Sequence, residues 1–179
     1  MKSRGFSVIV ATDLANGIGK ENTIPWYLPP DMAFFKQMTR VSSGQRPHLV
    51  LMGRRTWESL PVEYRPLPGR VNCVLSRDSQ LSVPKGVLVE HSMDSALEHA
   101  FIMQDNRDVD QIFIIGGRAL YVAALERSDC HTIYRTLIHD TFDCSVFFPM
   151  IDARYCLEDE SDMLDYNGLS YQFQRYRRG

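Results

Sequence analysis

Short apolar runs alternate with amphipathic segments along most of this chain. Runs rich in β-branched residues predict strands, and such runs occur at residues 6–12, 47–52, 71–75, 86–90, 110–115 and 132–138. Apolar residues at helical spacing predict helices, namely one that begins at Pro29-Pro30 and others over residues 54–60, 93–103 and 118–125. This alternation is typical of an α/β fold built on a parallel sheet.

The first run, FSVIVAT, is almost entirely apolar, which indicates a strand buried on both faces, as in a parallel sheet. Residues 13–28 are predicted to form a loop, because Asn16-Gly17 and Gly19 tolerate a left-handed backbone. Pro29 and Pro30 then suit the first turn of a helix, where the N–H group that proline lacks would have no partner.

The end of the chain has a different pattern. Residues 155–161 and 169–177 predict two strands, joined by a turn at Asn167-Gly168. Apolar and polar residues alternate in the second strand, which favours a half-exposed antiparallel edge. We therefore expect a single domain over residues 1–179. Its fold would be a three-layer α/β sandwich with a central, mostly parallel sheet of about eight strands and an antiparallel C-terminal hairpin.

Composition argues against several classes of function. The 179 residues include 20 basic and 22 acidic side chains, a net charge of −2, so binding to a nucleic-acid backbone is not expected. No run approaches the ~18 apolar residues of a membrane span, and the first residues lack the pattern of a secretory leader. The 4 cysteines form no C-x-x-C pair and the histidines no H-E-x-x-H, so we expect free thiols, no metal site and a cytoplasmic protein.

A carboxylate stands at the start of the first predicted helix. Asp31 lies there among the apolar side chains of Trp26, Met32 and Phe35. The commoner interpretation is that Asp31 caps the helix, because a helix N-terminus stabilises an anion. The alternative is an acid whose pKa is raised by burial among these apolar groups and which hydrogen-bonds a polar heterocycle.

Arginines, hydroxyl groups and glycines follow several predicted strands. Gly53-Arg54-Arg55-Thr56 follows one strand, Ser76-Arg77 another and Gly116-Gly117 a third. Because the carboxyl ends of parallel strands meet at one edge, these groups can converge on a phosphate, and the paired glycines let a ligand approach the backbone. The rigid loop RPLPGR ends in Arg70, which suits carboxylate recognition. The usual G-x-G-x-x-G fingerprint is absent.

In order and spacing, these motifs closely resemble those of dihydrofolate reductase. The resemblance covers nearly the whole chain and is carried by residues 8–11, 16–19, 25–35, 52–59, 65–70, 74–77 and 115–121. Residues 61–65 resemble the longer eukaryotic-type members, and residues 144–148 are similar to protozoan members, which are often fused to thymidylate synthase. The resemblance implies reduction of 7,8-dihydrofolate to tetrahydrofolate with NADPH. It also implies inhibition by antifolates and thymidylate synthase as a fused or associated partner.

The resemblance implies a set of substrate contacts. Asp31 would bind the 2-amino group and N3 of the pteridine, with Thr136 behind it, and its charge would favour protonation of N5 near Trp26. Arg70 would bind the α-carboxylate of the glutamate, as a bidentate pair. The other implied substrate contacts are Ile9, Val10, Met32, Phe35, Leu60, Leu67, Ile115 and Tyr121.

The resemblance also implies an NADPH site. Arg54 and Arg77 would lie near the 2′-phosphate, Gly116-Gly117 matches a cis peptide of the family, and residues 13–27 would close over the nicotinamide. The implied cofactor contacts are Ala11, Ile18, Gly19, Gly53, Arg54, Arg55, Thr56, Leu75, Ser76, Arg77, His91, Ile115, Gly116, Gly117, Arg118, Ala119, Leu120 and Tyr121.

Two positions depart from the family pattern. Arg118 stands where a small residue is usual, so it either changes how the backbone meets the pyrophosphate or adds a cation there. His91 stands where a Lys, Arg or polar residue often flanks the adenosine phosphate.

Two other functions stay open at this point. A pyrimidine reductase of riboflavin synthesis shares the fold and NADPH but would carry a different group at Asp31. A folate- or nucleotide-binding relative without catalysis is the other, and Asp31, Trp26 and Arg70 argue against it.

Overall fold

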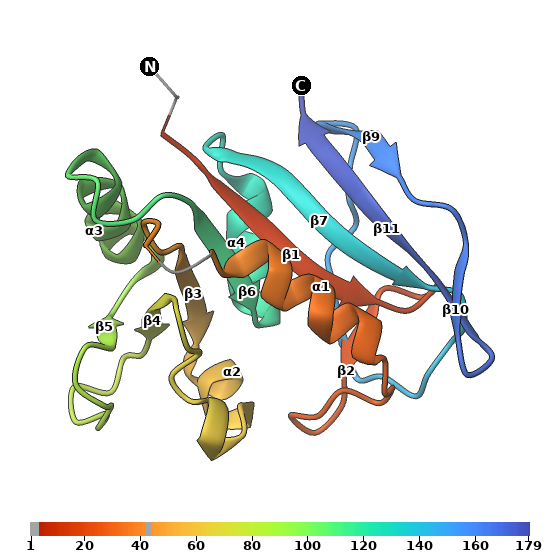
Figure 1. The fold of residues 1–179 in the computed structure, drawn as a ribbon, viewed down its shortest axis with the longest axis horizontal. Coiled ribbons are helices and arrows are strands. Elements are labelled where there is room, and N and C mark those ends of the chain that lie inside the picture. Colours follow the sequence, from red (N-terminus) through yellow and green to blue (C-terminus); the bar gives the residue numbers. More distant parts are fainter. Residues whose placement is uncertain (1–3, 42–43) are drawn as a thin grey trace.

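The computed structural model describes residues 4–41 and 44–179, and a nine-stranded sheet runs through it (Figure 1). The strand order is β10-β11-β7-β1-β6-β3-β4-β5, with β9 paired to β11. The strands of this sheet are β1 (Phe6–Thr12), β3 (Leu49–Gly53), β4 (Val71–Leu75), β5 (Leu88–Glu90), β6 (Ile112–Gly116), β7 (Cys130–Ile138), β9 (Tyr155–Glu160), β10 (Leu164–Tyr166) and β11 (Leu169–Arg178). The helices are α1 (Pro29–Thr39), α2 (Arg54–Ser59), α3 (Met93–Asp105), α4 (Arg118–Glu126) and a 3-10 turn at Val62–Tyr64.

Most of the sheet is parallel. β1 pairs in parallel with β6 and β7, β3 with β4 and β6, and β4 with β5. The C-terminal part is antiparallel, because β11 runs against β7, β9 and β10. The predicted fold, a mostly parallel sheet with an antiparallel C-terminal hairpin, is therefore confirmed.

Successive side chains of the central strands pack on opposite faces of the sheet. In β3, Leu49 and Leu51 join a core formed with α3 and α4. Val50 and Met52 join a second core, which includes Trp57 of α2 and aromatic residues of α1. Figure 1 shows α1 crossing one face of the sheet in front of β1. Burial on both faces explains why these strands read as continuous apolar runs.

Three short strands are not evident from the sequence pattern. Strand β2 (Gly17–Gly19) lies inside the segment predicted to be a loop, and it pairs with β8 (Val146–Phe147). We expected the turn at Asn167-Gly168 to join the last strand to residues 155–161, which contain β9. The turn instead joins β11 to the short strand β10. Strands of two or three residues are too short for an alternation of side chains to be recognised.

The expectation that the last strand is a half-exposed edge is wrong. Strand β11 lies between β7 on one side and β9 and β10 on the other. Its two glutamine side chains are hydrogen-bonded within the protein: the Gln174 amide donates to Glu160 Oε2 at 2.6 Å, and the Gln172 amide donates to the carbonyl of Ser161 at 3.1 Å. Polar alternation here marks hydrogen-bonded side chains and not an edge facing solvent.

None of the helices in the described ranges combines the length and the apolar character needed to cross a membrane. Within the same ranges, His, Cys, Asp and Glu side chains form no cluster that could hold a metal ion. The 4 cysteines are free thiols, and Cys73 and Cys130 are buried.

The loop that presents Arg70 is held by one buried amide. Asn72 is 2% exposed. Its Oδ1 accepts from the N–H of Leu67 at 2.9 Å, and its Nδ2 donates to the carbonyls of Leu67 at 3.0 Å and Arg70 at 3.1 Å. The peptide between Arg65 and Pro66 in this loop is cis. Asn72 thus ties the loop to the start of β4.

We expect Asn72→Ala to destabilise the protein by ~2–3 kcal/mol, because two buried backbone groups of Leu67 and the part-buried carbonyl of Arg70 would lose their partner. Urea unfolding followed by circular dichroism measures the change. Gln111→Ala, which removes an exposed amide, is the matched control and should change stability little. Equal stability of Asn72→Ala and the control would show that this amide does not hold the loop.

Candidate active site

The motifs that follow the central strands meet at one edge of the sheet. Strands β1, β3, β4 and β6 are parallel, so their carboxyl ends point the same way. The residues at or just after these ends are Asp13, Gly53, Ser76 and Gly116. Helices α2 and α4 begin at this edge as well, directly after β3 and β6. This is the edge at which open α/β sheets bind ligands.

Asp31 reaches from the first turn of α1 to the C-terminal part of β7. The Thr136 hydroxyl donates a hydrogen bond to Asp31 Oδ1 at 2.6 Å. Thr136 is buried, and it pairs with Ala11 of β1 on one side and Phe173 of β11 on the other, which fixes its position. Oδ2 of Asp31 has no hydrogen-bond donor among the described residues, which leaves this oxygen available to a ligand.

The surroundings of Asp31 decide between the two interpretations of this acid. Burial raises the pKa of the carboxyl, and the hydrogen bond from Thr136 opposes that effect. The N-cap of α1 is Leu28, and no side chain caps this helix. The capping interpretation is therefore wrong, and Asp31 is a partly buried acid that can accept hydrogen bonds from a polar heterocycle.

An apolar cluster covers the face of the sheet on which α1 lies. It contains Ile9, Phe35, Leu60, Leu67 and Ile115. Val10 differs, since its side chain belongs to the cluster on the opposite face, as neighbouring positions of a strand must. Val10 can contact a ligand beside Asp31 only through its backbone. Met32 is 64% exposed.

Tyr121 of α4 connects the two halves of this edge. Its buried hydroxyl donates to the carbonyl of Ile9 at 2.9 Å. Burial and the nearby negative charge of Asp31 raise the pKa of Tyr121. The phenol is therefore neutral at physiological pH and holds α4 against β1.

The backbone is open to close approach where β6 ends. The peptide between Gly116 and Gly117 is cis, and Gly116 has a φ of 131°. A Cβ atom on Gly116 would stand 3.3 Å from Thr56 Oγ1 and 3.4 Å from the Tyr121 hydroxyl. A Cβ atom on Gly117 would stand 3.6 Å from the same Thr56 oxygen. A side chain at Gly116 would crowd Thr56 and Tyr121, so this glycine lets the first turns of α2 and α4 lie close to the end of β6.

The arginines expected near phosphates differ in their surroundings. Arg54 Nε donates to Glu58 Oε1 at 2.7 Å, and its Nη1 donates to Asp78 Oδ2 at 2.9 Å. Two carboxylates therefore already balance its charge. Arg55 and Arg77 are exposed and form no ion pair with the described residues.

Both residues that depart from the family pattern bind backbone carbonyls. His91 Nδ1 lies 2.7 Å from the carbonyl of Ser76, just after β4. Arg118 Nη1 donates to the carbonyl of Phe147 at 2.5 Å. Arg118 thereby ties the first turn of α4 to β8.

The sequence pattern does not single out Asp13, which organises the loop after β1. Asp13 is fully buried. Its Oδ1 accepts from the N–H groups of Ala15 at 2.9 Å and Gly17 at 2.6 Å, and its Oδ2 accepts from the N–H of Phe142 at 2.9 Å. One carboxylate thus joins β2 to the segment that carries β8. An Asp directly after a buried strand and before Asn-Gly is the available sequence signal.

Arg70 lies at the other end of α1 from Asp31. Its Nη1 donates to Thr39 Oγ1 at 2.9 Å and its Nε donates to the carbonyl of Pro68 at 3.0 Å. Its guanidinium lies 5.9 Å from the centre of the Phe35 ring. Thr39 follows Asp31 by eight helical residues, which corresponds to roughly 12 Å along the axis. Helix α1 therefore separates an acceptor from a cation by a fixed length.

Trp26 precedes α1 and is half-buried. Its ring lies 5.3 Å from the ring of Phe142, at an interplanar angle of 59°. Leu28, which is buried, packs in the same cluster. The segment that leads into α1 is thereby packed against the segment held by Asp13.

The comparisons with known proteins agree with the fold. A family model described as Dihydrofolate reductase matches residues 5–178. A dihydrofolate reductase of Aedes albopictus is 36% identical over 181 residues, which cover 97% of this chain and 97% of that protein. Among solved structures, Schistosoma mansoni dihydrofolate reductase matches with a TM-score of 0.84 and 34% identity, covering 98% of both chains.

Plant relatives place the same segment in a longer protein. Bifunctional dihydrofolate reductase-thymidylate synthase 1 of Arabidopsis thaliana is 37% identical over 179 residues, which cover 98% of this chain and 34% of the relative. The chain thus spans about a third of the length of the plant relatives that it matches.

We expect Asp31→Asn to raise the stability of the ligand-free protein at neutral pH. The raised pKa of Asp31 means that the folded state binds more protons than the unfolded state, so stability falls as pH rises from the unfolded pKa through the folded pKa. Asn keeps an acceptor for Thr136 without the charge.

Thermal unfolding at pH 7.5 and at pH 4 measures this difference. Asp31→Asn should melt a few degrees above the unsubstituted protein at pH 7.5, and this difference in melting temperature should be smaller at pH 4. Asp162→Asn, at an exposed position, should melt at the same temperature as the unsubstituted protein at either pH. A lower melting temperature for Asp31→Asn at pH 7.5 would contradict the assignment.

Proposed function

Dihydrofolate reductase is the family to which this chain belongs, and from that premise we propose that the protein reduces 7,8-dihydrofolate to 5,6,7,8-tetrahydrofolate with NADPH. The observation that carries the proposal is the pairing of Asp31 with Thr136 at one end of α1, with Arg70 held by Thr39 at the other. A pteridine joined through an aminobenzoyl group to glutamate has hydrogen-bond donors at one end and carboxylates at the other, with apolar rings between them.

Asp31 binds and orients the pteridine in this proposal. Its carboxylate accepts hydrogen bonds from the 2-amino group and N3–H, and Thr136 prevents it from rotating away. Hydrogen bonds from the ligand favour the ionised acid, which burial alone disfavours. The negative charge at Asp31 then favours protonation of N5. Trp26 and the loop organised by Asp13 cover this end of the site and exclude water.

The residues present fit NADPH. Arg55 and Arg77 are exposed where the parallel strands end and form no ion pair with the described residues, so their charges are available to the phosphates of a dinucleotide. NADPH, when bound, supplies the hydride that reduces the pteridine. In this proposal, Ser76 and Arg77 after β4 contact the 2′-phosphate. Arg54 can join them only by exchanging Glu58 or Asp78 for that phosphate.

The product would enter one-carbon and thymidylate metabolism. The plant relatives are named as bifunctional dihydrofolate reductase-thymidylate synthases, which supports thymidylate synthase as a fused or associated partner. The free thiols of all 4 cysteines support a cytoplasmic location, because reducing compartments keep thiols unpaired.

Loss of NADPH absorbance on addition of dihydrofolate tests the proposal directly. Turnover should depend on dihydrofolate and be abolished by methotrexate. Asp31→Asn should lower turnover at pH 7 by roughly 10²-fold or more, because the ligand loses the charge that favours protonation. NADPH affinity, measured by fluorescence titration, should stay nearly unchanged.

Asp162→Asn is the matched control, and its turnover should equal that of the unsubstituted protein. NADPH oxidation that does not depend on dihydrofolate, or full turnover in Asp31→Asn, would overturn the proposal.

A further inference from the structure

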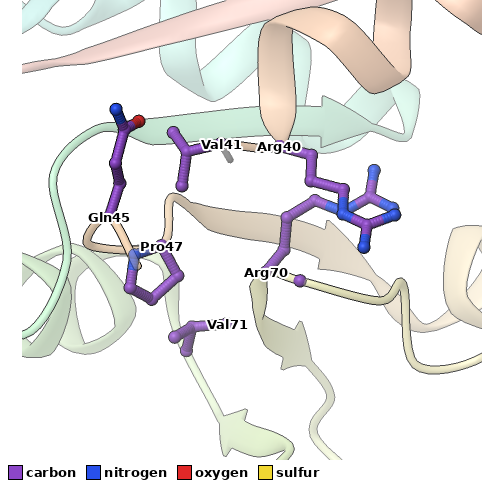
Figure 2. Close-up of a pocket in the computed structure, with 7 residues that line it drawn as sticks. Arg40, Val41, Gln45, Pro47, Arg70 and Val71 are labelled. Atoms are coloured by element: carbon purple, nitrogen blue, oxygen red, sulfur yellow. The ribbon is translucent and has the colours of Figure 1, made fainter. Parts of the chain in front are cut away.

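Two guanidinium groups lie together beside an open groove at the C-terminal end of α1. The groove has a volume of about 440 Å³, and Figure 2 shows Arg40 and Arg70 on one side of it. Its lining residues are Arg40, Val41, Gln45, Pro47, Gly69, Arg70 and Val71. Neither arginine forms an ion pair with a carboxylate of the described residues.

The side chain of Arg40 packs against the turn at Gly69, directly before Arg70. It is the C-cap of α1, and its N–H donates to the carbonyl of Lys36. A Cβ atom on Gly69 would stand 2.6 Å from Arg40 Nε and 3.2 Å from its Cγ and Cδ. Gly69 also has a φ of 73°. A glycine at this position is what allows the Arg40 side chain to lie across the turn.

The two cations repel each other. Burial and the charge of Arg40 lower the pKa of Arg70 to about 10, so both groups are still charged at neutral pH. Like charges held close together without a carboxylate raise the free energy of the protein, and a bound anion relieves this repulsion. Arg70 is fixed by Thr39 and Pro68, whereas no described hydrogen bond holds the Arg40 side chain.

We propose that Arg40 binds a carboxylate of a second, γ-linked glutamate on the tail of the ligand, so that this site prefers folates that carry this second glutamate. Arg70 binds the α-carboxylate of the first glutamate, and the tail then crosses Gly69 beside Arg40 into the groove. Val41, Pro47 and Val71 provide apolar walls there, and Gln45 provides an amide. The inference rests on the proposed function, because it assigns the substrate class of that same site.

Inhibition constants for methotrexate and for its γ-glutamyl derivative test the inference. The unsubstituted protein should bind the derivative roughly three- to tenfold more tightly, as expected for one partly exposed charge-assisted contact. Arg40→Gln should bring this ratio to about one, and Arg40→Glu should reverse it. High salt should reduce the preference in the unsubstituted protein, because salt screens exposed charges.

Arg107→Gln is the matched control, since Arg107 is an exposed arginine after α3. This variant should keep the full preference. Melting temperatures of all variants, measured by circular dichroism, exclude unfolding as the cause of a change.

The outcomes separate the two proposals. If the protein binds methotrexate but Arg40→Gln leaves the ratio unchanged, the inference about Arg40 fails and the proposed function stands. If the protein binds neither compound, both fail. If Arg40→Gln and Arg107→Gln reduce the preference for the γ-glutamyl derivative equally, the preference comes from general electrostatic attraction, and the inference is also overturned.

Discussion

The hydrogen bond from Thr136 to Asp31 ties the first turn of α1 to the C-terminal part of β7, and the rest of the candidate site depends on it. Strand β7 is fixed on both sides by β1 and β11. Helix α1 approaches it because two prolines begin the helix directly after the buried Leu28. The carboxyl is therefore held where burial opposes its charge, and hydrogen bonds from a ligand lower that cost.

Charge is separated along α1 in a way that suits an elongated ligand. Asp31 supplies an acceptor near the start of the helix, and Thr39 at its last position holds the guanidinium of Arg70. An apolar cluster that includes Phe35 covers the same face of the sheet. Arg55 and Arg77, which follow β3 and β4, lie at the edge where the parallel strands end. In the proposed function, one rigid helix would set the position of the folate and this sheet edge that of the cofactor.

Most of the fold could be predicted from the sequence, because strands such as β1 and β3 are buried on both faces and read as apolar runs. The antiparallel surroundings of β11 could not, since the hydrogen bonds of Gln174 and Gln172 depend on residues distant in sequence. The family resemblance placed Thr136 behind Asp31, although no local pattern links two residues that lie 105 positions apart. Asp13 was missed, because its role depends on a contact with Phe142 that no local pattern encodes. Val10 was expected among the substrate contacts, but its side chain packs on the opposite face of the sheet.

The carbon-13 chemical shift of the Asp31 carboxyl, followed by NMR against pH, tests the central claim most directly. In the ligand-free protein this carboxyl should titrate above its usual pKa, because burial disfavours its charge. In the complex with methotrexate it should stay ionised over the same range, because the protonated diaminopteridine donates to it. An ordinary pKa in the free protein together with no change on binding would contradict the account.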